Sequence, residues 1–184
     1  PIAVFDYDKN KKYRLLVVQG KALLMYDKTG KRIAGFKYKS AKKDITSQPK
    51  HFRIAGKDYI VFKHGSTLEV LDRKGLRRAR VKESIDFSDN AIYLYNNKFT
   101  TSNTRGELLE INEKGQIASS PLNLGPNHKI TTTSKTLVSL NDNKLSIKTK
   151  TVELDFGDYT HPKIFYINDK IYVTVTDLQS NKAY

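Results

Sequence analysis

A tight-turn motif recurs three times in this chain and limits what it can fold into. The motif occurs at Asp27-Lys28-Thr29-Gly30, Asp72-Arg73-Lys74-Gly75 and Asn112-Glu113-Lys114-Gly115, each time after an apolar run. The Asp or Asn side chain starts such a turn by bonding its own backbone, and the Gly takes the left-handed conformation that reverses the chain. The glycines lie 45 and 40 residues apart, a period typical of repeats that each form a four-stranded antiparallel sheet.

Short β-rich runs with alternating apolar residues surround each turn, and no window holds a helical apolar pattern. We expect almost no helix. The expected strands of the first four repeats are residues 2–6, 13–19, 22–27 and 32–38; 51–54, 58–63, 67–72 and 77–82; 91–95, 99–103, 107–112 and 116–122; and 129–133, 136–141, 144–148 and 151–156. The fourth repeat has lost its glycine turn at Lys148-Thr149-Lys150, and a fifth begins at Pro162 and stops where its third strand should start.

Sheets of this size cannot bury both faces alone, so neighbouring repeats must stack, and radial stacking is the usual solution for four-stranded units. The sequence therefore predicts an all-β chain, a β-propeller of four-stranded antiparallel blades. About four and a half blades are present, with limits near 1–43, 44–83, 84–122, 123–157 and 158–184, and we expect the chain to be a fragment of a larger propeller. The alternatives are a complete four-bladed propeller with a ragged end and a two-sheet sandwich.

The segment from Leu23 to Phe36 resembles the repeat of pyrroloquinoline-quinone-type (PQQ-like) β-propellers, in which an apolar strand leads into Asp-x-x-Gly-Lys and an aromatic residue follows. Residues 72–75 and 112–115 match the same turn. The resemblance implies a fold rather than an activity. Repeats of that family usually carry a tryptophan after the turn, and this chain has none, so we do not expect it to bind PQQ.

As a whole, the chain is also similar to propeller proteins of Bacteroidetes type, some of which are labelled ribonuclease HII. Ribonuclease H chemistry needs a cluster of about four carboxylates that holds two metal ions on a mixed α/β fold. In this chain Asp6 and Asp8 are one closely spaced pair of carboxylates rather than a cluster of four, and no helix is expected that could build such a fold, so the label does not predict nuclease activity. By analogy with bacterial propellers of this kind, a periplasmic or extracellular location is favoured.

The net charge of +14 is concentrated at one end of the chain. Residues 1–83 carry 22 Lys and Arg against 8 Asp and Glu, whereas residues 84–184 carry 11 of each. Such asymmetry indicates one positive surface that could attract nucleic acid, an anionic glycan or an acidic membrane face. The chain contains no run of about 18 apolar residues, so no membrane span is predicted. It also contains no cysteine, which excludes disulfides, thiolate catalysis and Cys-ligated metals.

The densest basic run, Arg77 to Lys82, is expected to form an outer strand. Alternation would place Arg78, Arg80 and Lys82 on one face. The corresponding strand of the first repeat offers Lys31, Lys37 and Lys39, with Lys42 and Lys43 just beyond. These two strands could form one basic rim for a polyanion, or the charges could simply keep an exposed edge strand from pairing with other chains.

Two other groups of residues invite a metal-site interpretation. Asp6, Asp8 and Asn10 match the start of a calcium loop, but Lys11 stands where that loop needs glycine, and Arg14 stands near its closing carboxylate. A hairpin turn is therefore favoured over a calcium site. The four histidines, His51, His64, His128 and His161, fall in expected loops on one face, yet nothing in their spacing forces them onto one zinc ion.

No catalytic residues can be named. Asp158 and His161 could form a base with an orienting carboxylate, but no nucleophile matches them, and no glycine turn opens a helix as a phosphate-binding loop does. We therefore expect a non-enzymatic propeller module that acts as a scaffold for a macromolecular partner, a protein in the first instance. The alternatives are polyanion binding through the basic rim, or a part of a larger hydrolase or nuclease-labelled protein whose site lies in other blades; the oligomeric state is left open.

Overall fold

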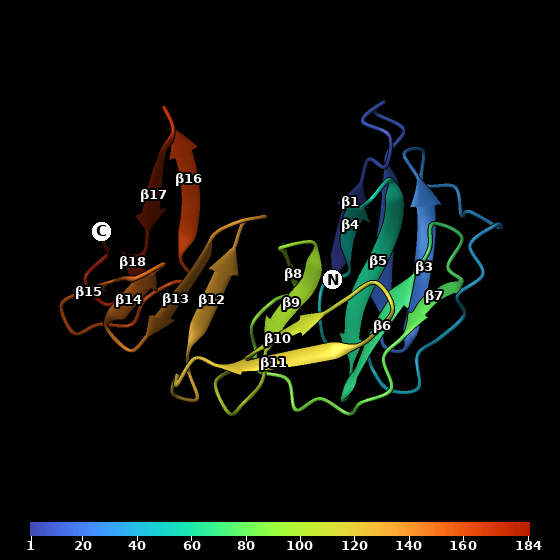
Figure 1. Cartoon of the computed structure of the whole chain (residues 1–184). Coiled ribbons are helices and arrows are strands. Elements are labelled where there is room, and N and C mark those ends of the chain that lie inside the picture. Colours follow the sequence, from blue (N-terminus) through green and yellow to red (C-terminus); the bar gives the residue numbers. More distant parts are fainter. The chain divides into compact units, whose positions relative to one another are not determined.

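The structure is a computed structural model that describes residues 1–184. It consists of strands without any helix, arranged in antiparallel sheets of two to four strands, so the predicted all-β class is confirmed (Figure 1). No helix is present that is long and apolar enough to cross a membrane. The chain divides into two compact units: unit 1 comprises Pro1–Ile85 and Asn112–Ile117, and unit 2 comprises Asp86–Ile111 and Ala118–Tyr184.

Unit 1 contains two meandering sheets in which each strand pairs with the next one along the chain. The strands of the first sheet are β1 (Ile2–Phe5), β2 (Arg14–Gln19) and β3 (Ala22–Asp27). Those of the second sheet are β4 (Lys50–Ile54), β5 (Lys57–His64), β6 (Thr67–Leu71) and β7 (Arg77–Arg80). Apart from the missing fourth strand of the first sheet, this order agrees with the predicted repeats.

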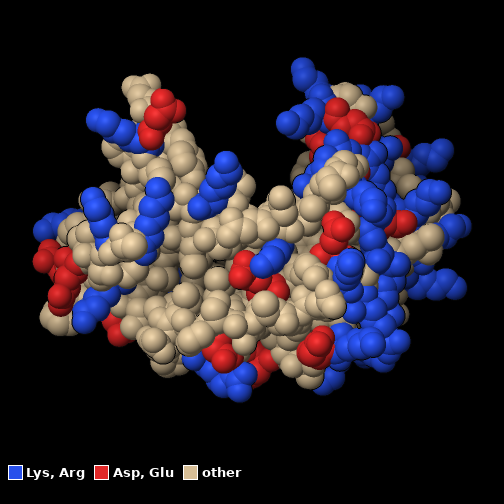
Figure 2. Space-filling model, viewed as in Figure 1, with Lys and Arg blue, Asp and Glu red and all other residues tan.

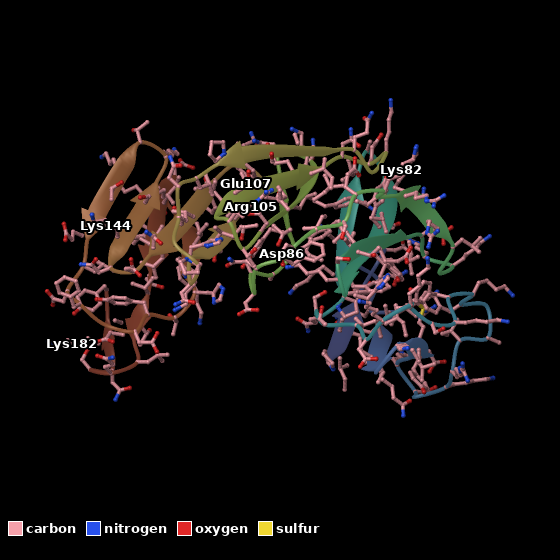
Figure 3. All side chains as sticks on the ribbon, turned by 90° about the horizontal axis from the view of Figure 1, so that it is seen from below. Lys82, Asp86, Arg105, Glu107, Lys144 and Lys182 are labelled. Atoms are coloured by element: carbon pink, nitrogen blue, oxygen red, sulfur yellow. The ribbon has the colours of Figure 1, made fainter.

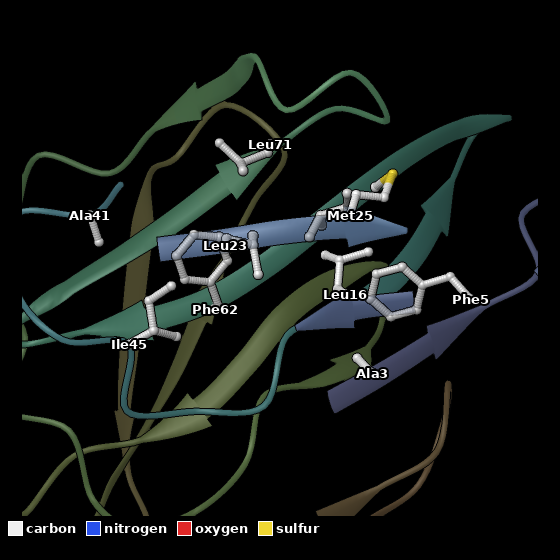
Figure 4. Packing of buried hydrophobic residues seen from close by; sticks show 10 residues of the cluster. Ala3, Phe5, Leu16, Leu23, Met25, Ala41, Ile45, Phe62 and Leu71 are labelled. Atoms are coloured by element: carbon white, nitrogen blue, oxygen red, sulfur yellow. The ribbon is translucent and has the colours of Figure 1, made fainter. Parts of the chain in front are cut away.

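The core of unit 1 lies between these two sheets (Figure 4). Leu16 pairs with Ala3 on one side and Met25 on the other, so the three side chains share one face of the first sheet. They form one buried cluster with Phe62 and Leu71 of the second sheet. Because side chains alternate along a strand, the opposite face of β1 presents its own apolar residues, and Ile2 and Val4 are more than half exposed.

The predicted fourth strand of the first repeat, residues 32–38, is wrong. Only isolated bridges pair this part of the chain with β3, from Arg32 to Tyr26 and from Ser40 to Ala22. Its apolar side chains pack against the core instead, and the Tyr38 ring meets the Phe62 ring edge-on at 5.5 Å. Burying these aromatic groups against the second sheet favours a path away from β3, at the cost of strand pairing.

The three glycine turns have the hydrogen bonds expected from the sequence. The side-chain oxygen of Asp72 accepts hydrogen bonds from the backbone N–H groups of Lys74 and Leu76, at 2.8 and 2.9 Å. Asp27 and Asn112 make the equivalent bonds in their own turns. In the fourth repeat, Lys148 takes the left-handed conformation, with φ of 52°, and the chain still reverses there without a glycine.

The third sheet contains β8 (Tyr93–Tyr95), β9 (Lys98–Ser102), β10 (Glu107–Ile111) and β11 (Ile117–Pro121), and its β10–β11 turn belongs to unit 1. The fourth contains β12 (Lys129–Thr132), β13 (Leu137–Asn141), β14 (Lys144–Ile147) and β15 (Lys150–Glu153). The fifth repeat forms two hairpins, β16 (Lys163–Ile167) with β17 (Lys170–Thr174), and β18 (Thr176–Asp177) with β19 (Lys182–Ala183). Within unit 2, β12 contacts both β8 and β16, so the first strands of successive repeats are neighbours.

Candidate anion-binding site

Unit 1 carries the whole net charge of the chain. It holds 23 Lys and Arg against nine Asp and Glu, a net charge of +14, whereas unit 2 holds ten of each. Figure 2 shows the Lys and Arg side chains gathered over the strands of unit 1. The asymmetry along the sequence is therefore also an asymmetry between the two compact units.

A pocket of about 400 Å³ lies on this unit, along β6 and β7. Its cationic side chains come from two parts of the chain: Lys42 from the segment that joins the two sheets, and Arg77, Arg80 and Lys82 from β7 and the residues after it. Lys82 is exposed just beyond the end of β7 (Figure 3). The other lining residues are His64, Thr67, Leu68, Glu69, Ala79 and Val81.

Glu69 is the only acidic residue in the pocket lining, and other groups already occupy its carboxylate. The Arg77 guanidinium donates to Oε1 at 2.8 Å, and the Tyr38 hydroxyl donates to Oε2 at 3.4 Å. The hydrogen bond to Glu69 raises the pKa of Arg77, and burial raises the pKa of Tyr38, with the Glu69 charge adding to the effect. Glu69 therefore offsets Arg77, which leaves Lys42, Arg80 and Lys82 without an ion-pair partner.

His64 lies at the end of β5, where it lines the same pocket and is only 3% exposed. Its Nε2 atom lies 3.4 Å from Oε2 of Glu69. In the tautomer that carries the proton on Nε2, this nitrogen donates to the Glu69 carboxylate. The other ring nitrogen, Nδ1, is buried and has no hydrogen-bond partner, which is uncommon for a buried polar atom and calls for an explanation.

The predicted basic row on β7 is broken by a β-bulge. Glu69 pairs with Arg80 and Val70 with Ala79, but Leu71 pairs with Arg77, so Arg78 is the extra residue. Its guanidinium lies 5.3 Å from the centroid of the Tyr59 ring. Tyr59 belongs to the face of Val61 and Val70, opposite to Glu69. The prediction that Arg78 shares a face with Arg80 and Lys82 is therefore wrong, because the inserted residue reverses the alternation.

The predicted lysines of the first repeat lie elsewhere on unit 1. Lys31, Lys37 and Lys39 are exposed, and none of them lines the pocket. The Lys37 N–H donates to the Lys74 carbonyl at 2.7 Å, which places this segment beside the β6–β7 turn. Of the six predicted residues, the structure thus brings together only Arg80 and Lys82, with Lys42, Arg77 and His64 as additional members.

A second, more open hollow adjoins the β5–β6 turn. It is lined by Lys21, Lys43, Asp44, Thr46 and Gly65. The Lys43 side chain passes so close to Gly65 that a Cβ added there would lie 2.7 Å from its Cδ atom. Gly65 directly follows His64 in the β5–β6 turn. Lys21 and Lys43 therefore extend the basic surface from the pocket around this turn.

The predicted calcium residues each have other partners. Asp6 accepts the N–H groups of Asn10 and Lys11, and Asn10 accepts that of Lys12. The Arg73 guanidinium instead donates to both oxygens of Asp8, to Oδ1 at 2.6 Å and to Oδ2 at 3.1 Å. The loop closes on its own backbone and on an arginine, and no group of three or more His, Asp or Glu side chains is placed to hold a metal ion.

Asp58 lies at the centre of a charge cluster near Asp8. Its carboxylate accepts from His51 at 2.7 Å, Arg53 at 3.0 Å and Arg73 at 2.5 Å. Burial opposes ionisation of this carboxyl group, but these hydrogen bonds outweigh it and lower the pKa of Asp58 to about 2. The cluster is internally neutralised and offers no free acceptor set for a cation.

The remaining histidines do not join His64. His51 belongs to the Asp58 cluster, whereas His128 and His161 lie in unit 2 around Asn90. Burial lowers the pKa of His161, and the Lys129 charge adds to this. Asp158 pairs with Lys129 at 3.6 Å rather than with His161. The expected loop positions of His51 and His64 are wrong, because His51 lies within β4 and His64 is the last residue of β5. The Asp158–His161 dyad is not formed.

One serine lies at catalytic distance from a histidine, with Ser102 Oγ 2.8 Å from His128 Nε2. His128 Nδ1 faces the Gly125 carbonyl at 2.7 Å, which fixes the tautomer. However, Ser102 is fully buried and His128 is 4% exposed. Asn90 donates to Ser102 Oγ and to the His128 carbonyl, and its own oxygen accepts the Ile130 N–H. This network connects β9 to the start of β12 and leaves no room for a substrate at Ser102.

Comparisons with known proteins give the fold alone. No family model matches the chain, and no curated protein matches it. Among solved structures, the computationally designed Ika8 protein aligns with 99% of this chain and 59% of its own, at a TM-score of 0.61 and 12% identity. BBS1N, solved in complex with ARL6DN and soaked with lead, aligns with the whole chain and 64% of its own, at a TM-score of 0.61 and 7% identity. The chain spans about three fifths of the length of these structures, which it resembles in the arrangement of its strands.

Proposed function

We propose that this chain is a non-catalytic binding module built from β-propeller repeats, and that unit 1 binds a polyanion through its basic surface. The observation that carries the proposal is the grouping of Lys42, Arg80 and Lys82 around one pocket without acidic partners, on the unit that holds the whole net charge. Cations that protein carboxylates do not neutralise are available to phosphate or sulfate groups.

The propeller part of the proposal is supported by how the repeats stack. In unit 2, neighbouring first strands are linked where Thr132 donates to the Leu94 carbonyl at 3.4 Å. In unit 1, the first strands of the two sheets meet through the Phe5 and His51 rings, at 5.6 Å. The apolar outer face of β1, with Ile2 and Val4, is the kind of surface that a further sheet covers in a stacked repeat array.

The non-catalytic part is supported by the enclosure of the chemistry-bearing groups. The one serine–histidine contact is buried within hydrogen bonds, and the carboxylates of the Asp58 cluster are neutralised by arginines. Repeat folds present wide surfaces suited to binding. A protein partner, the first expectation from the sequence, would on this surface have to be acidic.

The proposal is tested by measuring the affinity of the full chain for heparin and for double-stranded DNA across a range of salt concentrations. Each phosphate neutralised on B-DNA contributes a slope of about −0.9 to the plot of log affinity against log salt. The variant Arg80→Glu with Lys82→Glu should bind at least about tenfold more weakly and lose about 2 from the slope for DNA.

The matched control is Lys144→Glu with Lys182→Glu, which makes the same charge change at exposed lysines of unit 2 (Figure 3). It should retain its affinity within about twofold. Equal losses in the two variants would mean that only total charge matters, and absence of binding to both polymers at low salt would refute polyanion binding and leave an acidic protein as the partner.

A further inference from the structure

We infer that the chain associates head to tail with a second copy of itself, through a contact between the first sheet of one copy and the fifth repeat of the other. This inference rests on the stacked-repeat part of the proposed function and is independent of polyanion binding. It names the surface that covers the exposed face of β1.

The first support is that the first sheet is apolar on both faces. The outer β1–β3 face consists of the side chains of Ile2, Val4, Leu15, Val17, Leu24 and Tyr26. In the register of the sheet, Val17 lies between Ile2 and Leu24. None of the six belongs to the buried cluster between the sheets, and all six retain accessible surface.

An antiparallel sheet with one face in water usually alternates apolar residues with polar ones. The first sheet departs from this pattern, because its outer β1–β3 face contains no charged side chain. A contiguous apolar face of this kind marks an interaction site rather than a solvated surface.

The second support is an unpartnered apolar face on the last repeat. Phe165 pairs with Tyr172, and Ile167 follows on the same side of β16. These three exposed side chains form the hairpin face. The opposite side of β16 carries Tyr166, whose hydroxyl lies 2.9 Å from that of Thr136, just before β13. The fifth repeat therefore uses its other side to pack within unit 2, and the hairpin face remains uncovered.

Charge favours a head-to-tail contact over the pairing of two identical outer β1–β3 faces. Such a symmetric pair would bring together two units that each carry a net charge of +14, whereas unit 2 carries no net charge. The lysines of the hairpin face, Lys163 and Lys170, lie at its two ends, where their charged groups can stay in water. A second copy thus meets less repulsion when it presents its hairpin face to unit 1.

The test is sedimentation velocity of the full chain over a range of concentrations, where the average mass should rise above the 21.0 kDa of one chain. The head variant, Ile2→Glu with Val4→Glu, and the tail variant, Phe165→Glu with Ile167→Glu, should each raise the dissociation constant at least about tenfold. The wild-type side chains at these positions are all exposed, so both variants should fold, which circular dichroism checks.

The matched control is Leu76→Glu with Phe156→Glu, which makes the same charge change at exposed apolar residues outside both faces. One of these residues lies in each unit, so the control also corrects for the altered net charge. Its association should stay within about twofold of the wild type.

Mixing the two variants separates a head-to-tail contact from a symmetric one. The head variant keeps its hairpin face and the tail variant keeps its outer β1–β3 face, so an equimolar mixture should form a complex of two chains and nothing larger. If two outer β1–β3 faces paired instead, the tail variant alone would associate like the wild type, and mixing would not restore association of the head variant.

A mass of one chain at every concentration, equal losses in the face and control variants, or a mixture that stays monomeric would overturn the contact. If the chain were monomeric but bound heparin or DNA with a steep salt dependence, polyanion binding would stand without the contact. If the mixed variants associated while neither polymer bound the chain, the contact would stand and polyanion binding would fail.

Discussion

Replacing Gly75 by alanine should destabilise the chain far more than the same change at Gly30, although the two glycines occupy equivalent turns. Both have positive φ, 76° and 81°, so each alanine incurs the left-handed backbone penalty of roughly 1–2 kcal/mol. At Gly30 a new Cβ would meet nothing within 4 Å. At Gly75 it would lie 2.8 Å from the backbone nitrogen of Tyr38 and 2.9 Å from the Phe36 ring.

A backbone atom cannot move aside as a flexible side chain does, and overpacking of this kind costs about 1–3 kcal/mol more. We therefore expect Gly30→Ala to lose about 1–2 kcal/mol of unfolding free energy and Gly75→Ala about 2–5 kcal/mol. Urea unfolding followed by circular dichroism measures both. Equal losses would refute the packing of residues 36–38 against the β6–β7 turn, and with it the account of why the first sheet lacks a fourth strand.

Three further predictions follow from the contacts. The pKa of Asp58 is about 2 in the folded chain and about 3.9 when unfolded, so the stability that this carboxylate contributes is present above pH 4 and is lost as the pH falls toward 2. In urea unfolding at a series of pH values, Asp58→Asn should reduce the acid-induced loss of unfolding free energy by up to about 2 kcal/mol. An unchanged pH profile would contradict this expectation. Asn90→Ala should cost about 2–4 kcal/mol in the same assay at pH 7, because the buried Ile130 N–H loses its acceptor and Ser102 loses a donor; a loss below about 0.5 kcal/mol would show that the network is not stabilising. A fluorophosphonate probe analysed by mass spectrometry should leave the fully buried Ser102 unlabelled in the native chain, and stoichiometric labelling would reveal an accessible nucleophile.

The turns and most strands could be predicted from the sequence because their determinants are local. Asp72 and Gly75 specify a reversal through bonds within five residues, and alternating apolar residues mark the strands on either side. The failure at residues 32–38 has a nonlocal cause. Alternation there suits a strand, but Tyr38 finds a better apolar contact on Phe62, 24 residues further along the chain, and one sequence without a structure does not show that contact.

The site was predictable only in part for the same reason. Net charge and the run from Arg77 to Lys82 indicated a basic surface in this part of the chain, and Arg80 and Lys82 line the pocket there. The bulge that removes Arg78 depends on pairing with β6, and no residue of the basic run signals it. The sequence predicted that His64 lies in a loop, whereas it is the last residue of β5. Its unpaired nitrogen arises from the packing around Glu69, which the sequence alone does not show.

The most direct test of the central claim, that unit 1 is the binding surface, is an amide NMR map of the full chain as a short heparin fragment is added. The account predicts that the shifts concentrate at Lys42 to Asp44, His64 to Thr67 and Arg80 to Lys82, and that they diminish as salt is raised. Shifts centred on unit 2, or spread evenly over every exposed lysine of the chain, would contradict it.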